Sequence, residues 1–289
     1  MRPAVLAFLF VAFATAATAQ TGIQHDVVFD QYTPLTDNHE LLRRLLPRDG
    51  WQTAEDYLAK SGQNLQAQSI DLSKEHFVVY VPSTPPPAAG YGLMVFVPPW
   101  DEAGMPDGWQ SVFDAHHMIY VSAAQSGNDQ TVSTRRVPLA VLAEVNVAKR
   151  YPIDPARVYV GGFSGGSRVA LRVAVAYPDL FAGAFLNAGA DPIGSKRIPV
   201  PPDELLARFQ ENTRVYFAIG AQDIGNLTLE GGSLRSMNDY CVFNVRQKIV
   251  PDVMHDVASA NVLDEALDYL DTPPVNDAAQ LSSCRAARH

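Results

Sequence analysis

Ser164 lies in the segment 162–166, whose sequence GFSGG has the pattern G-x-S-x-G. An apolar run at 157–160 precedes it, and an alanine- and valine-rich segment follows it. This pattern, placed between a strand and a helix, bends the chain sharply and lifts the serine hydroxyl above the edge of a sheet. Glycines suit the turn because its backbone is strained and other segments pass close to it. The spacing therefore predicts that Ser164 is a nucleophile.

A serine hydroxyl needs a base that takes its proton and an acid that orients the base. In parallel sheets of this kind, the acid and then the base follow the serine along the chain, each on a loop after a strand. Asp223 follows an expected strand at 214–219, and His255 follows an expected strand at 246–250. We therefore expect Asp223 to orient His255, and His255 to take the proton of Ser164.

Other interpretations of these two residues stay open. Asp223 could cap a turn, which is a frequent structural role of aspartate, and His255 could be an ordinary surface histidine. Asp252 and Asp256 are rival acids, but they lie too close to His255 in sequence to reach around its ring easily. The remaining histidines and the cysteines lack the spacing of metal ligands. The sequence therefore gives little support for a metal site.

Backbone N–H groups are needed where negative charge develops on the substrate carbonyl oxygen, at a site called the oxyanion hole. Gly165, directly after the nucleophile, is expected to supply one N–H from the start of a helix. The second should come from the loop after an expected strand at 93–97, whose residues 98–101 read PPWD. Because prolines have no N–H, Trp100 or Asp101 must be the second donor.

Large side chains near this loop and the serine are candidates for an acyl or aromatic subsite. The expected substrate-binding residues are Trp100, Phe163, Met105 and Trp109. A tryptophan in a loop can equally serve packing alone.

Strands and helices alternate from about residue 76. Strands are expected at 76–81, 93–97, 118–123, 157–160, 184–186, 214–219 and 246–250, and helices at about 137–150, 167–177, 233–240 and 258–270. Short, wholly apolar strands separated by helices predict an α/β fold with a mostly parallel sheet covered by helices on both faces. The short connection between the strands at 184–186 and 214–219 argues against a large lid.

The chain has 289 residues, 47% of them apolar, which suits one large α/β domain. Residues 1–19 combine Arg2, an apolar run and a small-residue site ending at Ala19, and are expected to be a signal peptide cleaved after Ala19. The apolar run is shorter than the roughly 20 residues of a membrane-spanning helix. Residues 20–75 are expected to be a lead-in, with helices near 38–46 and 53–58, that packs on a catalytic domain at 76–289.

The formal net charge of −9 gives the protein no electrostatic reason to bind nucleic acid or anionic lipid. Cys241 and Cys284 suit an exported protein that joins them in one disulfide. Buried free cysteines are the alternative. A secreted or periplasmic location follows from the signal peptide, whereas the sequence says nothing of the oligomeric state.

Two segments around the serine support a resemblance to a known family. The sequences IDPARVYVGGFSGG at 153–166 and YPDLFAGA at 177–184 resemble the α/β-hydrolase superfamily, and within it secreted polyhydroxybutyrate depolymerase-like and feruloyl esterase-like enzymes. This resemblance implies a serine esterase with Ser164, Asp223 and His255 as its triad. It also implies an acyl-enzyme intermediate, no cofactor, and a small or polymeric ester as substrate. The chain departs from the group at 98–101, where members usually carry a His-Gly pair.

Two other functions remain as alternatives. A serine peptidase of the same fold would use the same triad, although such peptidases normally add a propeller or lid domain. A catalytically silent binding protein on this scaffold is suggested by the unusual loop at 98–101.

Overall fold

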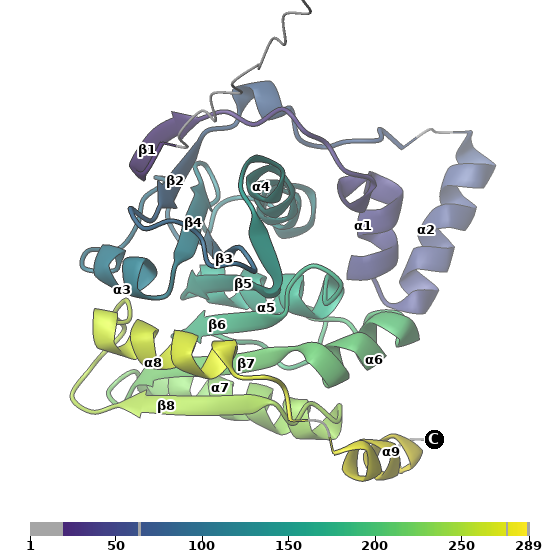
Figure 1. The fold of residues 1–289 in the computed structure, drawn as a ribbon. Coiled ribbons are helices and arrows are strands. Elements are labelled where there is room, and N and C mark those ends of the chain that lie inside the picture. The colour runs from purple at the N-terminus through teal and green to yellow at the C-terminus, as the bar shows by residue number, and fades with distance from the viewer. Residues whose placement is uncertain (1–19, 63–64, 276, 288–289) are drawn as a thin grey trace, which may run out of the picture.

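The central element of the molecule is an eight-stranded sheet, shown in Figure 1. The computed structural model describes residues 20–62, 65–275 and 277–287, so the expected signal peptide at 1–19 lies outside the described residues. The strand order is β1-β2-β4-β3-β5-β6-β7-β8. Strands β3 to β8 are parallel to one another, while β2 pairs antiparallel with β4 on one side and with the edge strand β1 on the other.

The strands are β1 (Gly22–Val27), β2 (Phe77–Val81), β3 (Tyr91–Val97), β4 (Met118–Ala123), β5 (Ile153–Phe163), β6 (Gly183–Asn187), β7 (Arg214–Gly220) and β8 (Val245–Val250). The helices are α1 (Asn38–Leu45), α2 (Arg48–Ser61), α3 (Gln110–Ala115), α4 (Val137–Arg150), α5 (Gly165–Ala176), α6 (Asp203–Asn212), α7 (Ile224–Asp239), α8 (Ala260–Asp271) and α9 (Ala278–Ala286). Short helical turns lie at Pro34–Thr36, Leu72–Lys74 and Val132–Arg136.

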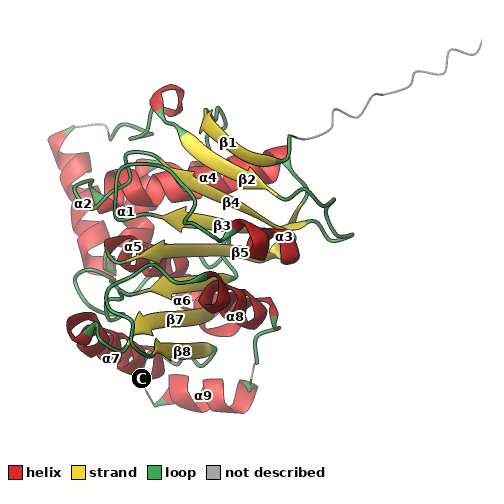
Figure 2. Cartoon of the chain, turned by 90° about the vertical axis from the view of Figure 1, so that its left-hand side faces the viewer, coloured by secondary structure: helices red, strands yellow, loops and turns green. Residues whose placement is uncertain are grey.

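Helices cover both faces of the sheet, as Figure 2 shows. Apolar side chains of α1, α4, α5, α6 and α7 pack on one face, and those of α3 and α8 pack on the other. Every residue of β3, β4 and β7 is buried, because both sides of these strands face helices. The expected doubly covered, mostly parallel sheet is therefore confirmed.

Two expected helices begin earlier than the sequence indicated, and both begin next to a candidate site residue. The helix expected from 167 starts at Gly165, directly after Ser164. The helix expected from 233 starts at Ile224, directly after Asp223. Gly231 and Gly232 lie in the middle of α7, and glycine weakens the helical signal of a sequence. Four elements were not expected at all, namely β1, α3, α6 and α9.

The lead-in at 20–75 contributes to the sheet as well as to its cover. Strand β1 pairs antiparallel with β2 and becomes the edge of the sheet. Arg44 of α1 is buried and forms an ion pair with Asp179, with an Nη1–Oδ1 distance of 2.7 Å. The division of the chain at residue 76 stays a prediction.

Cys241 and Cys284 are joined in a disulfide, with their Cα atoms 5.9 Å apart. This bond ties α9, near the C-terminus in Figure 1, to the end of α7. Among the described residues, no helix combines the length and apolar character that crossing a membrane requires.

Candidate active site

Ser164 lies in a sharp turn between β5 and α5. Its backbone has φ 54° and ψ −118°, a strained region for a residue with a side chain, and such strain often occurs at functional sites. The Ser164 N–H donates to the carbonyl oxygen of Asn187 at 2.8 Å, which ties the turn to the end of β6. The turn therefore presents the serine at the carboxyl edge of the sheet, where ligands of such sheets bind.

The glycines on either side of Ser164 are required by close backbone contacts. A Cβ atom on Gly162 would collide with the backbone of Gly166, and one on Gly166 would collide with the carbonyl group of Val97 at the end of β3. The G-x-S-x-G pattern is thus explained by packing in the turn as well as by its strain.

His255 and Asp223 form a continuous row of hydrogen bonds with Ser164. His255 Nε2 lies 2.8 Å from Ser164 Oγ, and His255 Nδ1 lies 2.6 Å from Asp223 Oδ2. Because the carboxylate can only accept, Nδ1–H donates to Asp223, which leaves Nε2 of the neutral ring to accept from the serine hydroxyl. Asp223 lies in the short turn between the end of β7 at Gly220 and the start of α7, and its side chain is 9% exposed against 40% for His255. The structure brings together all three residues expected from the sequence.

Two residues, Asn187 and Trp109, anchor the loop that carries His255 through hydrogen bonds with Ala258. The Ala258 N–H donates to Asn187 Oδ1 at 2.7 Å, and the Trp109 indole N–H donates to the carbonyl oxygen of Ala258 at 2.9 Å. Trp109 is fully buried, so it has no surface for a substrate, and its expected role in substrate binding is corrected to that of an anchor for this loop. Asn187 was missed by the sequence analysis, although it stands at the carboxyl end of an expected strand.

Backbone N–H groups for an oxyanion hole are available on two sides of Ser164. Gly165 opens α5, and the first N–H groups of a helix have no partner within the helix. On the other side of the serine, the N–H groups of Trp100 and Asp101 donate to no partner among the hydrogen bonds of the described residues. Both expected second donors are therefore free to bind a substrate oxygen.

The loop at 98–101 is held by hydrogen bonds on its opposite side. The Arg136 guanidinium donates to the carbonyl oxygen of Pro98 at 2.8 Å, and the Asn128 N–H donates to that of Pro99 at 3.0 Å. Asp101 Oδ1 accepts from the Gly127 N–H at 2.9 Å, so this side chain braces the loop. Burial lowers the pKa of Arg136, and the nearby Asp101 carboxylate opposes that shift. The segment 125–136 thus supports the loop, a role that its sequence did not indicate.

Two aromatic side chains lie beside the histidine and the serine. The Phe163 ring lies 4.9 Å from the His255 ring and 6.2 Å from the Trp100 ring, measured between centroids. Trp100 is partly exposed and Phe163 keeps a small exposed area, while Met105 is partly buried against the cluster around Trp109. Trp100 and Phe163 are therefore better placed for an apolar acyl or alcohol group than Met105.

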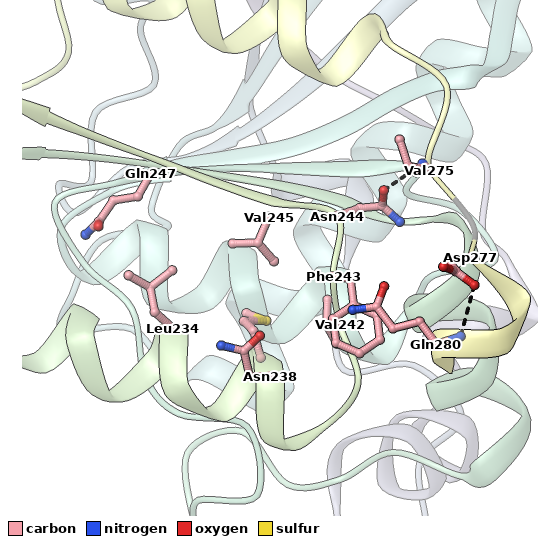
Figure 3. Close-up of a pocket in the computed structure, with 11 residues that line it drawn as sticks. Leu234, Asn238, Val242, Phe243, Asn244, Val245, Gln247, Val275, Asp277 and Gln280 are labelled. Atoms are coloured by element: carbon pink, nitrogen blue, oxygen red, sulfur yellow. Dashed lines mark hydrogen bonds between the residues drawn. The ribbon is translucent and has the colours of Figure 1, made fainter. Parts of the chain in front are cut away.

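Several pockets elsewhere in the described residues, the largest of them about 670 Å³ and next to α2, carry none of the three triad side chains. One, of about 490 Å³, lies between α7, β8 and α9 and is shown in Figure 3. A smaller one, of about 130 Å³, lies beneath the His255 loop and includes Asn187 and Val257. Within the described residues, no group of three or more His, Cys, Asp or Glu side chains is arranged to hold a metal ion.

Comparisons with known proteins give one match in sequence and several in structure. No model of a known protein family matches the chain. A curated poly(3-hydroxybutyrate) depolymerase from Ralstonia pickettii is 32% identical over 87 residues, which are 30% of this chain and only 17% of that protein. A ferulic acid esterase structure has a TM-score of 0.49 at 14% identity and covers 67% of this chain and 89% of its own. Est1E from Butyrivibrio proteoclasticus has a TM-score of 0.48 at 15% identity, covering 67% and 91%.

Because these TM-scores are low, the fold is assigned on the chain's own topology. The parallel strands β3 to β8, the antiparallel β2 and the serine turn between β5 and α5 together form the α/β-hydrolase fold. The acid after β7 and the histidine after β8 follow the order serine, acid, histidine of that fold. The fold expected from the sequence is confirmed.

Proposed function

We propose that this protein is an exported serine hydrolase that cleaves carboxylic esters. The observation that carries the proposal is the row Ser164–His255–Asp223, with distances of 2.8 Å and 2.6 Å between the bonded atoms. A serine next to the free ring nitrogen of a histidine, itself oriented by a carboxylate, is the arrangement that activates a hydroxyl for acyl transfer.

In the first step, Ser164 Oγ attacks the ester carbonyl carbon while His255 Nε2 takes the hydroxyl proton. The carbonyl oxygen becomes an oxyanion, which the N–H groups of Gly165 and Trp100 stabilise. His255 then gives its proton to the departing alcohol, and an acyl-enzyme remains.

In the second step, His255 takes a proton from water as the water attacks the acyl carbon. Ser164 leaves with that proton when the carboxylic acid is released, so the enzyme returns to its first state. Asp223 stays ionised throughout and stabilises the imidazolium that forms in each step.

We favour Trp100 over Asp101 as the second oxyanion donor. The carbonyl and the carboxylate of Asp101 both accept hydrogen bonds from the segment 125–130, so this residue already serves to hold the loop. The Trp100 ring, in contrast, lies beside Phe163, the residue before the nucleophile. The same two rings suggest that one substituent of the ester is apolar.

The proposal is tested with short-chain nitrophenyl esters, amino-acid nitroanilides and a fluorophosphonate probe. We expect ester turnover and labelling of the protein, and a loss of kcat by roughly 10⁵–10⁶-fold in Ser164→Ala. Ser111→Ala, on the exposed side of α3, is the matched control and should keep full activity. Preference for the anilides would favour a peptidase. A folded wild-type protein that is neither labelled nor active would contradict the proposal.

A further inference from the structure

Asn226 lies against the candidate catalytic acid. It belongs to the first turn of α7, three residues after Asp223, and its Nδ2 is 3.0 Å from each of the two carboxylate oxygens. The same nitrogen is 3.2 Å from His255 Nδ1. The Asp223 carboxylate therefore receives hydrogen bonds from two sides, from the imidazole and from this side-chain amide.

The orientation of the Asn226 amide is set by Arg168. Arg168 Nη2 lies 2.9 Å from Asn226 Oδ1. A guanidinium group has only donors, so the amide oxygen must face Arg168. The NH₂ group must then face Asp223, and the reversed orientation would leave Arg168 opposite a second donor.

Arg168 is itself held by a carboxylate with little solvent exposure. Its Nη1 lies 2.9 Å from Asp191 Oδ1, and the Asp191 side chain is 10% exposed. Arg197 contacts the same oxygen at 3.1 Å. Arg168 lies one turn after Ser164 on α5, and its N–H donates to the Ser164 carbonyl oxygen at 3.3 Å. The chain of contacts thus joins the helix that begins at the serine to the helix that begins at the acid.

We propose that Asn226 is a positioning residue for Asp223 and that Arg168 and Asp191 fix its orientation. Two N–H bonds from one rigid amide oppose rotation of the carboxylate, which keeps Oδ2 on His255 Nδ1 and so keeps Nε2 on the serine. This inference rests on the proposed function, because positioning matters only if Asp223 and His255 act on Ser164.

A purely structural role for Asn226 would be to stabilise the start of α7. The two roles differ in their effect on His255, since only a contact with Asp223 changes the surroundings of the imidazole ring. The charged and titratable groups near this pair are Arg168 of α5, Asp191 after β6, Glu230 of α7, and Asp252 and Asp256 of the His255 loop. Burial raises the pKa of Glu230 to about 7, so it is largely uncharged in acid solution.

The test compares Asn226→Asp with Asn226→Leu. Asn226→Asp keeps the shape and the contact with Arg168 but places a second carboxyl group 3.0 Å from both oxygens of Asp223. Two carboxyl groups this close share one proton and lose it only as the pH rises, so the kcat of Asn226→Asp should stay near that of wild type in mildly acid solution and fall at higher pH, where wild type shows no such fall. Asn226→Leu should lower kcat about tenfold with KM unchanged, because small misplacements of catalytic groups are costly.

The surroundings of the His255 ring are followed by NMR, with the imidazole resonances assigned by means of His255→Gln, and they should shift in Asn226→Leu; this measurement requires no turnover. A wild-type protein without turnover or labelling would therefore refute the proposed function, whereas the NMR result decides on Asn226 alone. Asn238→Leu, on the exposed far end of α7, is the control and should change nothing. Adding Arg168→Met to Asn226→Leu should lower kcat little further, because Arg168 acts on Asp223 only through its contact with Asn226. Unchanged His255 resonances and full kcat in folded Asn226→Leu, with a wild-type pH profile in Asn226→Asp, would overturn the inference.

Discussion

Two groups of residues lie on different sides of Ser164. One contributes side chains and the other contributes backbone N–H groups. On one side, Asp223 and His255 follow β7 and β8 and contribute side chains at 2.6 Å and 2.8 Å in one row. On the other side, the loop at 98–101 follows β3 and contributes backbone N–H groups, held in place by Arg136, Asn128 and Gly127.

This difference explains why one side can be identified from sequence and the other cannot. Proton transfer requires particular side chains, so the acid and the base are visible as residue types after expected strands. An oxyanion hole requires only N–H groups, which every residue except proline has. The usual His-Gly pair is therefore dispensable for donation, provided that another set of contacts fixes the loop.

The largest loss expected on the side-chain half of the cleft follows from Asp223→Asn. An amide in place of the carboxylate holds the imidazole in the wrong tautomer, and kcat should fall by roughly 10⁴-fold. The measurement is kcat for a nitrophenyl ester across pH. Asp256→Asn and Asp252→Asn are matched controls in the His255 loop and should stay within about threefold of wild type. An equal loss of kcat in either control would show that Asp223 is not the residue that orients His255.

The role of the backbone N–H groups is tested at Trp100 with two substitutions. One removes the N–H, and the other removes the ring but keeps the N–H. Trp100→Pro removes the N–H and should lower kcat by about 10²–10³-fold, the usual cost of one oxyanion donor. Trp100→Ala keeps the N–H and removes the ring, so kcat should be nearly unchanged while KM rises for apolar esters. Thermal unfolding shows whether the proline variant is folded. If Trp100→Ala loses as much kcat as Trp100→Pro, the Trp100 ring and not its N–H is required for catalysis.

Most of the framework was predictable, and the exceptions have physical causes. Apolar strands buried on both faces have a clear signal, and so does the glycine-bounded serine turn. Strand β1 was missed because its sequence, GIQHDV, is polar and half-exposed at an edge of the sheet. Trp109 was misjudged because an indole in a loop has the same sequence whether it faces a substrate or the carbonyl of Ala258. Asn226, Arg168 and Asp191 are far apart in the chain, so only the fold reveals their contact.

A smaller effect is expected where the two halves of the cleft touch, at Gly165. A Cβ atom there would collide with Asn128 Oδ1, and Asn128 also holds the loop through the Pro99 carbonyl. Gly165→Ala should therefore displace Asn128 and lower kcat about tenfold. Asn128→Gly in the same chain should restore much of that loss. Gly104→Ala is the control, because its Cβ atom would meet no atom within 4 Å. If the losses of kcat from Gly165→Ala and Asn128→Gly simply add in the double variant, the two residues do not act on each other.

The smallest effect concerns the opposite end of the strands, where we expect stability to change with pH while the cleft does not. Burial alone lowers the pKa of His116, but hydrogen bonds to Asp271 and Asp264 outweigh it and raise the pKa. The same contacts, with Arg157 and Tyr159, hold the pKa of Asp271 at about 2 despite its burial. The charged pair joins the end of α3 to α8.

A histidine with a raised pKa stabilises the fold fully below its unfolded pKa of about 6.5. That contribution is lost as the pH rises through the higher folded value. The Tm of wild type should therefore fall by roughly 2–4 °C across this window, whereas the Tm of His116→Gln should stay nearly flat. The kcat of the two proteins should have the same pH dependence, because His116 lies at the amino edge of β4 and Ser164 at the carboxyl edge of β5. Parallel Tm curves would show that His116 is not charged in the folded protein, and a shifted kcat profile would show that the two ends of the sheet are coupled.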